Sequence, residues 1–405
     1  MDFGTIELDD RHRALQQEAR DFVREQFTDE VYEHEHRTGD GFNEKVHLAM
    51  GRRGWILPTR PVERGGAGLD ALGARVLELE LQKAHVPWVT LGTTRLVLSA
   101  VERYASDAIR DDVVAAVASG RVRFCLGYTE PDGGSDIAGA KTRAVRDGDE
   151  WTVNGSKIFT TGAHNCQYTF LITRTDPELP KHKGLTMFLM PLDARGVEIQ
   201  GIWAFSGERT NIVYYDNVRI SDDYRLGAVN DGWTVLHGPL DEEHSIGGGE
   251  EAGLDDPSIG VQFVRELHRA LDEAARWADT PGPDGSRPAD DPSVRHRLGA
   301  VAVELEAALA TPGPFGRVKC AETVVSGAAE LLDLLGPVGL LSRGSRGAVG
   351  DGQVDFAHRY AQGTATYGGT VEVFRTIIAQ HELGLPRATY PGSKAFLSRS
   401  GSQGS

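Results

Sequence analysis

The order of helical and strand-like segments constrains the fold of this chain more than any other feature. Residues 1–119 place apolar side chains at the three- and four-residue spacing of amphipathic helices. Residues 120–228 carry short aromatic and β-branched runs that favour strands, and helical spacing returns over residues 229–388. Strands that are grouped, instead of alternating with helices, exclude a doubly wound sheet. The pattern predicts an α+β protein with an N-terminal helical domain, a middle antiparallel β domain and a C-terminal helical domain.

Local signals refine this order. Asp9 or Asp10 is expected to cap the first helix. Asn154-Gly155 is a hairpin turn signal between strand candidates at residues 151–153 and 157–159. The Ser/Gly-rich end, residues 389–405, is expected to be disordered. Further strands are expected at residues 168–173, 185–191 and 212–218, and further helices at residues 294–310, 316–335 and 372–383.

Composition excludes several classes of function. The 405 residues are enough for two or three domains, and the net charge of −16 argues against nucleic acid and anionic membranes as partners. A phosphate-bearing cofactor is compatible with this negative charge, because backbone N–H groups can hold it. The three cysteines are far apart and the 13 histidines lack metal-ligand spacing, so we expect neither disulfides nor a metal site. Without a signal peptide or a run of 18 apolar residues, a cytoplasmic protein is expected.

The densest chemical signal is the segment from Tyr128 to Asp136. Gly133 and Gly134 allow a ligand to approach the backbone closely, and Thr129 and Ser135 supply hydroxyls beside free N–H groups. The segment suits the polar edge of a ring or a pyrophosphate. The alternative, which the spacing alone favours, is an ordinary glycine-rich turn.

Three further segments are candidates. Phe159, followed by Thr160 and Thr161, can stack against and hydrogen-bond a flat heterocycle, although a plain strand end has the same pattern. The run 240–244 opens a helix with three carboxylates, and one of them would be a general base if it is buried. The alternative is that these acidic residues only stabilise the first turn of the helix. The loop 367–372, directly before the last helix, is the third candidate. The alternative is that it is only a flexible helix cap. No hydrolase elbow and no early dinucleotide-binding glycine motif occur.

These motifs, in this order, resemble the acyl-CoA dehydrogenase family over about residues 5–388. Thr129–Asp136 matches its Thr-Glu-Pro-x-x-Gly-Ser-Asp motif, and Asn154–Thr161 matches Asn-Gly-x-Lys followed by an aromatic residue and threonine. Tyr367–Val373, followed by Arg375, matches the final Tyr-x-Gly-Thr-x-Glu-Val motif. The resemblance implies a C-terminal four-helix bundle and FAD bound at a subunit interface.

The resemblance also implies an activity. In the family, N5 of FAD accepts a hydride from the acyl β-carbon while a carboxylate removes the α-proton, which gives a trans-2-enoyl thioester. An electron-transferring flavoprotein then reoxidises the flavin. The thioester carbonyl must be polarised where enolate charge develops. The family uses a ribityl hydroxyl and a backbone N–H for this, and by position that N–H belongs to Gly368.

The position of the base departs from most of the family. Most members carry the catalytic glutamate where this chain has Gly368. A minority, including isovaleryl-type and steroid side-chain enzymes, place it on a helix in Leu-x-x-Glu-Arg, which assigns the base to Glu243. Glu242 lies about 100° round the helix from Glu243 and cannot face the same ligand. A bulky, branched or steroid-like acyl group is therefore expected, with Asp241 and His244 at the substrate.

The remaining site residues follow from the motifs. Tyr128, Thr129, Gly134 and Ser135 are expected to line the flavin, with Ser135 also near the acyl carrier. Phe159, Thr160 and Thr161 are expected at the isoalloxazine, and Thr370 and Glu372 on the phosphate or ribityl side. Gly368 and Ser135 complete the expected substrate contacts, together with Asp241 and His244.

Other departures leave alternatives open. Asp333 and Pro337 replace residues that face the pyrophosphate, where an acidic side chain would repel it and proline donates no N–H. This favours either a heterotetramer with a second dehydrogenase-like chain or a non-catalytic subunit of one, and a homotetramer stays open. His244 in place of the family arginine leaves open an acyl group on a carrier protein, or a flavin oxidase or tailoring enzyme.

Overall fold

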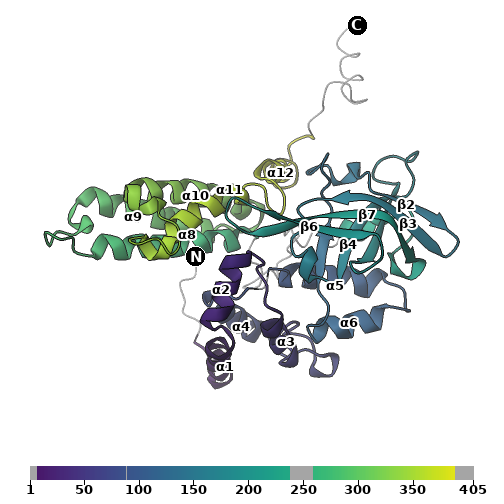
Figure 1. Ribbon diagram of the computed structural model, residues 1–405, viewed down its shortest axis with the longest axis horizontal. Coiled ribbons are helices and arrows are strands. Elements are labelled where there is room, and N and C mark those ends of the chain that lie inside the picture. The colour runs from purple at the N-terminus through teal and green to yellow at the C-terminus, as the bar shows by residue number, and fades with distance from the viewer. Residues whose placement is uncertain (1–6, 88, 238–258, 388–405) are drawn as a thin grey trace, which may run out of the picture. The chain divides into compact units, whose positions relative to one another are not determined.

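The computed structural model describes residues 7–87, 89–237 and 259–387 (Figure 1). The chain divides into two compact units, a first unit of residues 1–256 and a second unit of residues 257–405. The tail expected to be disordered, residues 389–405, lies outside the described residues, as do Asp241, Glu243 and His244.

The first unit begins with helices. Asp9 caps the first of them by accepting a hydrogen bond from the backbone N–H of His12, so the predicted cap is confirmed. Ala19 and Phe22 on its inner face are buried, which the helical spacing requires. The helices are α1 (Asp10–Gln26), α2 (Asp29–Thr38), α3 (Glu44–Arg52), α4 (Ala71–Lys83), α5 (Leu91–Tyr104) and α6 (Arg110–Ala118).

A single sheet follows in the order β6-β7-β3-β2-β4-β5-β8, with β1 paired to β4. Its strands are β1 (Phe124–Gly127), β2 (Arg143–Asp147), β3 (Glu150–Lys157), β4 (Tyr168–Arg174), β5 (Leu185–Pro191), β6 (Val197–Trp203), β7 (Arg209–Ser221) and β8 (Arg225–Leu226). Most neighbours are antiparallel. The pairs β1–β4 and β2–β4 are parallel, so the sheet is mixed. The α+β fold class is confirmed.

The hairpin turn predicted at Asn154-Gly155 is wrong. Strand β3 runs through both residues, and the turn lies instead at Gly148, between the paired ends of β2 and β3. Gly155 forms a β-bulge with a φ of +144°, and a Cβ there would lie 2.8 Å from Thr142. The Asn-Gly signal marked a position that needs glycine, but the strand continues past it.

The sheet curls around a core of its own. Phe170 and Ile172 of β4 face a core shared with the N-terminal helices, whereas Leu171 faces the opposite side. The rings of Trp151 on β3 and Phe188 on β5 pack edge to face at 5.3 Å, although these strands are not neighbours. Burial on both faces fixes the ends of β1 and β3, where the candidate loops begin.

The second unit is a four-helix bundle followed by a short helix. Its helices are α8 (Ile259–Asp279), α9 (Pro292–Leu309), α10 (Gly313–Leu335), α11 (Gln353–Thr364) and α12 (Val371–Ile377). The four long helices lie side by side in Figure 1. Their core is built from α10 residues Val324, Ala328 and Leu331 packed with Leu267 of α8. The implied bundle is confirmed.

Helix α10 is also the most apolar helix of the described residues. By length and composition alone, the segment Gly313–Leu340 would be able to cross a membrane. Cys320, Val324 and Leu331 on this helix are fully buried among the other bundle helices. Its hydropathy is that of a central core helix.

Candidate functional site

The glycine-rich loop leaves β1 and is joined to the end of β3. Tyr128 is buried, and its ring packs edge to face on Phe170 at 6.0 Å. The carbonyl of Thr129 accepts a 2.9 Å bond from the N–H of Ile158. Gly134 and Ser135 are exposed, and a Cβ on Gly133 would meet no atom within 4 Å. The loop therefore offers bare backbone to a ligand.

A buried ion pair holds this loop. The Nζ of Lys157, at the end of β3, lies 2.7 Å from Oε1 of Glu130, with side-chain exposures of 0% and 9%. Glu130 also accepts 2.7 and 2.8 Å bonds from the backbone N–H groups of Lys141 and Thr142. Burial acts to raise the pKa of Glu130, but Lys157 and these donors hold it below its usual range. Burial lowers the pKa of Lys157 to about 8, so the pair is charged at neutral pH.

An exposed aromatic ring follows Lys157. Phe159 has a φ of +58°, a left-handed conformation rare for an aromatic residue, and its side chain is 62% exposed. Strand β7 holds this geometry: the N–H of Thr160 donates to the carbonyl of Asn211 at 2.9 Å, and the Asn211 amide donates back at 3.0 Å. The hydroxyls of Thr161 and Thr210 lie 3.0 Å apart. A strained backbone thus presents a flat apolar shelf beside polar groups.

In the second unit, a buried arginine holds the loop after α11. Arg317 of α10 is 1% exposed, and its Nη2 donates to the carbonyls of Thr364, Tyr367 and Gly369 at 2.8, 2.6 and 3.0 Å. Gly368 and Gly369 both have positive φ angles, which glycine tolerates. Among the described residues, the N–H of Gly368 donates to no acceptor. The loop therefore presents a fixed donor.

The other predicted residues of the second unit have local partners. The hydroxyl of Thr370 caps α12 by accepting from the N–H of Val373 at 3.2 Å. Glu372 is exposed and lies 3.9 Å from Arg375. Their placement on the phosphate or ribityl side of a flavin stays a prediction.

Asp333 is also partnered. Its carboxylate accepts a 2.6 Å bond from Arg297 of α9, which also pairs with Glu330. Glu330 first, and then Asp333, raise the pKa of Arg297 above its usual range. The charge expected to repel a pyrophosphate is thus partly offset within the bundle, because Asp333 shares the one guanidinium of Arg297 with Glu330.

The structure gathers the predicted residues into two groups. The first unit joins Tyr128 and Thr129 to the end of β3, directly before Phe159, Thr160 and Thr161, whereas Gly134 and Ser135 lie further along the glycine-rich loop. The second unit brings together Gly368, Thr370 and Glu372. In the described part of the chain, no three His, Cys, Asp or Glu residues form a group suited to a metal ion.

Three positioning residues were missed from the sequence. Glu130 and Lys157 lie inside two of the motifs but were not predicted as site residues, because Lys157 ends a strand of mixed burial and its residue type gave no signal of pairing. Arg317 lies on an apolar helix face, where a cation needs buried acceptors. The three residues fix loops that carry the exposed candidate groups.

The first group fits a flat polar heterocycle. The exposed ring of Phe159 offers a stacking face, and the hydroxyl of Thr161, 3.0 Å from that of Thr210, offers a hydrogen bond two residues further along the chain. The bare backbone at Gly133 and Gly134 leaves room for close approach.

Comparison with known proteins decides the family. The N-terminal, middle and C-terminal domains of acyl-CoA dehydrogenase match residues 9–121, 125–218 and 257–312. The acyl-CoA dehydrogenase FadE29 of Mycobacterium tuberculosis is 34% identical over 301 residues, which are 73% of each chain. The chain belongs to the acyl-CoA dehydrogenase family. Its members are flavin-dependent oxidoreductases that act on CH–CH bonds, and the resemblance carried by the three motifs is confirmed.

Solved structures agree with this assignment. The Tcur3481-Tcur3483 steroid ACAD aligns with a TM-score of 0.79 at 29% identity, over 95% of this acyl-CoA dehydrogenase and 100% of that chain. The ChsE4-ChsE5 complex from Mycobacterium tuberculosis aligns with a TM-score of 0.76 at 27% identity, over 95% and 100%.

Proposed function

We propose that this acyl-CoA dehydrogenase binds FAD and oxidises the α,β bond of an acyl thioester to a trans-2-enoyl thioester. The observation that carries the proposal is the exposed Phe159 ring on a left-handed backbone beside Thr161. Such strain persists where the surroundings enforce it, and it clusters at ligand sites. The two hydrogen bonds between Thr160 and Asn211 of β7 supply that enforcement.

The residues of this chain have separate tasks in the reaction. The N–H of Gly368 donates to the thioester oxygen as enolate charge develops there. Glu243 removes the α-proton as general base. Phe159 and Thr161 hold the isoalloxazine ring, and Thr370 and Glu372 belong to its ribityl or phosphate side. Bound FAD supplies the hydride acceptor.

A bulky, branched or steroid-like acyl group is the proposed substrate. Gly368 leaves the space that a glutamate side chain would fill at this position. The name of one structural relative, a steroid ACAD, is consistent with a large acyl group. Reoxidation is assigned to an electron-transferring flavoprotein in the cytoplasm. Oxygen consumption during turnover without that acceptor would instead indicate a flavin oxidase.

The base assignment is tested with a pair of neighbouring variants. The Glu243→Gln variant is expected to keep the flavin. Its rate of flavin reduction by acyl-CoA is expected to fall by at least about 1,000-fold, because the α-proton then has no acceptor. Glu242→Gln is the matched control and is expected to reduce at the wild-type rate. Anaerobic stopped-flow absorption measures both. Normal reduction in the Glu243→Gln protein would overturn the assignment.

A heterotetramer with a second dehydrogenase-like chain is the proposed assembly. Two structural relatives are named as pairs of different chains. Pro337 donates no N–H at the expected pyrophosphate contact. Flavin content and mass of the chain expressed alone and with such a partner test this. A fully active homotetramer with one flavin per chain would contradict it.

A further inference from the structure

A line of hydrogen bonds runs from the strained segment at Phe159 to the loop after α2. The side-chain amide of Asn211 donates to the carbonyl of Thr160 at 3.0 Å and lies 3.1 Å from Nδ1 of His164. The other ring nitrogen of His164, Nε2, lies 3.0 Å from the carboxylate of Asp40. Asn211 is 0% exposed, and the side chains of His164 and Asp40 are 11% and 15% exposed. Polar groups at this depth depend on fixed partners.

These bonds fix the protonation state of His164. The carbonyl of Thr160 can only accept, so the side-chain nitrogen of Asn211, and not its oxygen, must face it. The same nitrogen faces Nδ1 of His164, which is therefore unprotonated and accepts. The neutral ring carries its proton on Nε2, where the carboxylate of Asp40 accepts it. The amide of Asn165, 2.9 Å from Nε2, can turn its oxygen toward the same proton.

The surroundings of His164 favour this neutral ring. Burial first, and then the guanidinium of Arg209, hold the pKa of His164 below its usual range, although Asp40 acts to raise it. The carboxylate of Asp40 also lies 3.6 Å from Arg209 and 3.8 Å from His34 of α2. A protonated ring would point a second N–H at the amide nitrogen of Asn211, so the arrangement requires the neutral form.

The end of the line at Asp40 is held by backbone contacts. The N–H of Arg209, at the start of β7, donates to the carbonyl of Gly39 at 2.8 Å. Gly39 has a φ of +66°, and a Cβ there would lie 2.1 Å from the carbonyl oxygen of Gly207. Only glycine allows this approach. The loop after α2 is thus fastened to the connection between β6 and β7, and Asp40 is a fixed acceptor.

We infer that His164 is a positioning residue for the flavin, acting through Asn211 on the backbone of Thr160. The inference rests on the proposed function, because Phe159 and Thr161, on either side of Thr160, are the proposed contacts of the isoalloxazine ring. The left-handed backbone of Phe159 persists only while its neighbours hold it. Without an acceptor at Nδ1 the amide of Asn211 can rotate, and Thr160 then loses one of its two bonds to β7.

Two substitutions at this position separate the acceptor from the bulk of the ring. His164→Asn places an oxygen near the position of Nδ1, whereas His164→Leu fills similar space without an acceptor. Fluorescence titration with FAD is expected to give a Kd about tenfold higher for His164→Leu, because one buried hydrogen bond is lost. The Kd of His164→Asn is expected to stay within about threefold of the wild type. A wild-type Kd in His164→Leu, or equal losses in both variants, would overturn the inference.

Amide hydrogen exchange gives a second readout that needs no turnover. The N–H of Thr160 donates to the carbonyl of Asn211, so its exchange reports how firmly this segment lies against β7. With the same excess of FAD in every sample, exchange over residues 159–163 is expected to be about tenfold faster in His164→Leu and near the wild-type rate in His164→Asn. Unchanged exchange in His164→Leu would overturn the inference. This pattern in proteins that bind no FAD would contradict only the proposed function.

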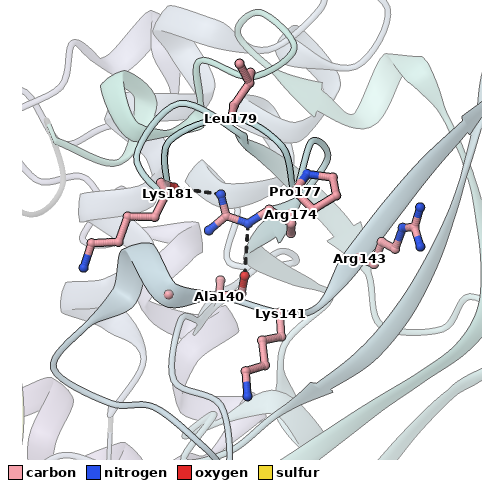
Figure 2. Close-up of a pocket in the computed structure, with 8 residues that line it drawn as sticks. Ala140, Lys141, Arg143, Arg174, Pro177, Leu179 and Lys181 are labelled. Carbon is pink, nitrogen blue, oxygen red and sulfur yellow. Dashed lines mark hydrogen bonds between the residues drawn. The ribbon is translucent and has the colours of Figure 1, made fainter.

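Arg174→Gln is the control for loosening elsewhere in the first unit. Figure 2 shows Arg174 in a pocket of about 450 Å³, where its guanidinium donates to the carbonyls of Ala140 and Lys181 at 3.3 and 2.8 Å. None of the residues that line this pocket belongs to the line through His164. The control is expected to exchange faster near residues 138–140 and at the wild-type rate over residues 159–163. Equal acceleration of residues 159–163 in the control and in His164→Leu would indicate general destabilisation and overturn the inference.

Discussion

Buried cations organise both groups of candidate site residues. Lys157 ties the glycine-rich loop to β3 through the carboxylate of Glu130, and Arg317 holds the loop around Gly368 through three carbonyls. A buried cation is costly unless its hydrogen bonds are met, so each fixes its loop in one arrangement. The exposed residues nearby, Phe159 and Gly368, depend on these anchors.

Lys157→Met is expected to lower the free energy of unfolding by about 3–5 kcal/mol, because it leaves Glu130 buried without its cation. Flavin content should fall with it, since the loop after β1 loosens. The double variant Lys157→Met/Glu130→Leu should recover part of the stability, as no buried charge remains. Unfolding in urea measures the free energy of unfolding of the wild type and of both variants.

The matched control is Lys141→Met, which breaks the exposed pair with Asp132. It should cost less than about 1 kcal/mol. Equal losses from the Lys157 and Lys141 variants would show that the buried pair is not an anchor.

Arg317→Lys tests the second anchor. The lysine side chain is shorter than that of arginine and its ammonium is not planar, so its nitrogen would not lie where Nη2 lies among the three carbonyls, and the Gly368 N–H should lose its fixed position. The expected result is a fall in kcat of about 10- to 100-fold with little change in KM, because carbonyl polarisation matters most in the transition state. Arg375→Lys, at an exposed pair with Glu322, is the control. A rise in KM alone would contradict this role.

At the scale of elements, the order of helices and strands was predictable, because burial of one face sets the spacing of apolar residues along each segment. Helix α11 was not predicted, since its buried positions include the small residues Ala357 and Ala361, which give a weak apolar pattern. The Asn154-Gly155 signal failed because a bulge and a turn both need glycine.

The motif residues of the site could be predicted, but their anchors could not. Glu130 and Lys157 are 27 residues apart, and Arg317 is about 50 residues from the carbonyls it holds. Spacing within a segment carries no information about such pairs, which only the packed fold brings together.

His47 on α3 gives an element-scale prediction. It is 3% exposed, and burial, with Arg123 and Arg95 nearby, lowers its pKa to about 3. The unfolded chain therefore takes up the proton first, and stability falls as pH drops from 6.5 towards 3. Between pH 7 and pH 5 this amounts to about 2 kcal/mol.

In His47→Gln this part of the pH dependence should disappear. His268→Gln, at an exposed histidine on α8, should keep it. Unfolding in urea at pH 7 and pH 5 measures the difference between each variant and the wild type. An identical pH dependence in the wild type and the His47 variant would contradict the assignment.

At the scale of the whole molecule, the expected flavin contacts are divided between two compact units. Phe159 and Thr161 belong to the first unit, and Gly368 and Thr370 to the second. The family assignment covers both units.

The central claim is that this chain holds a flavin which an acyl thioester reduces. The most direct measurement is the visible absorption of the purified protein, with its partner chain where one is required, before and after anaerobic addition of acyl-CoA. We predict an oxidised flavin spectrum that bleaches with formation of a 2-enoyl-CoA. A folded protein that carries no flavin, alone or with a partner, would contradict the account, as would a flavin that no branched or steroid-like acyl-CoA bleaches.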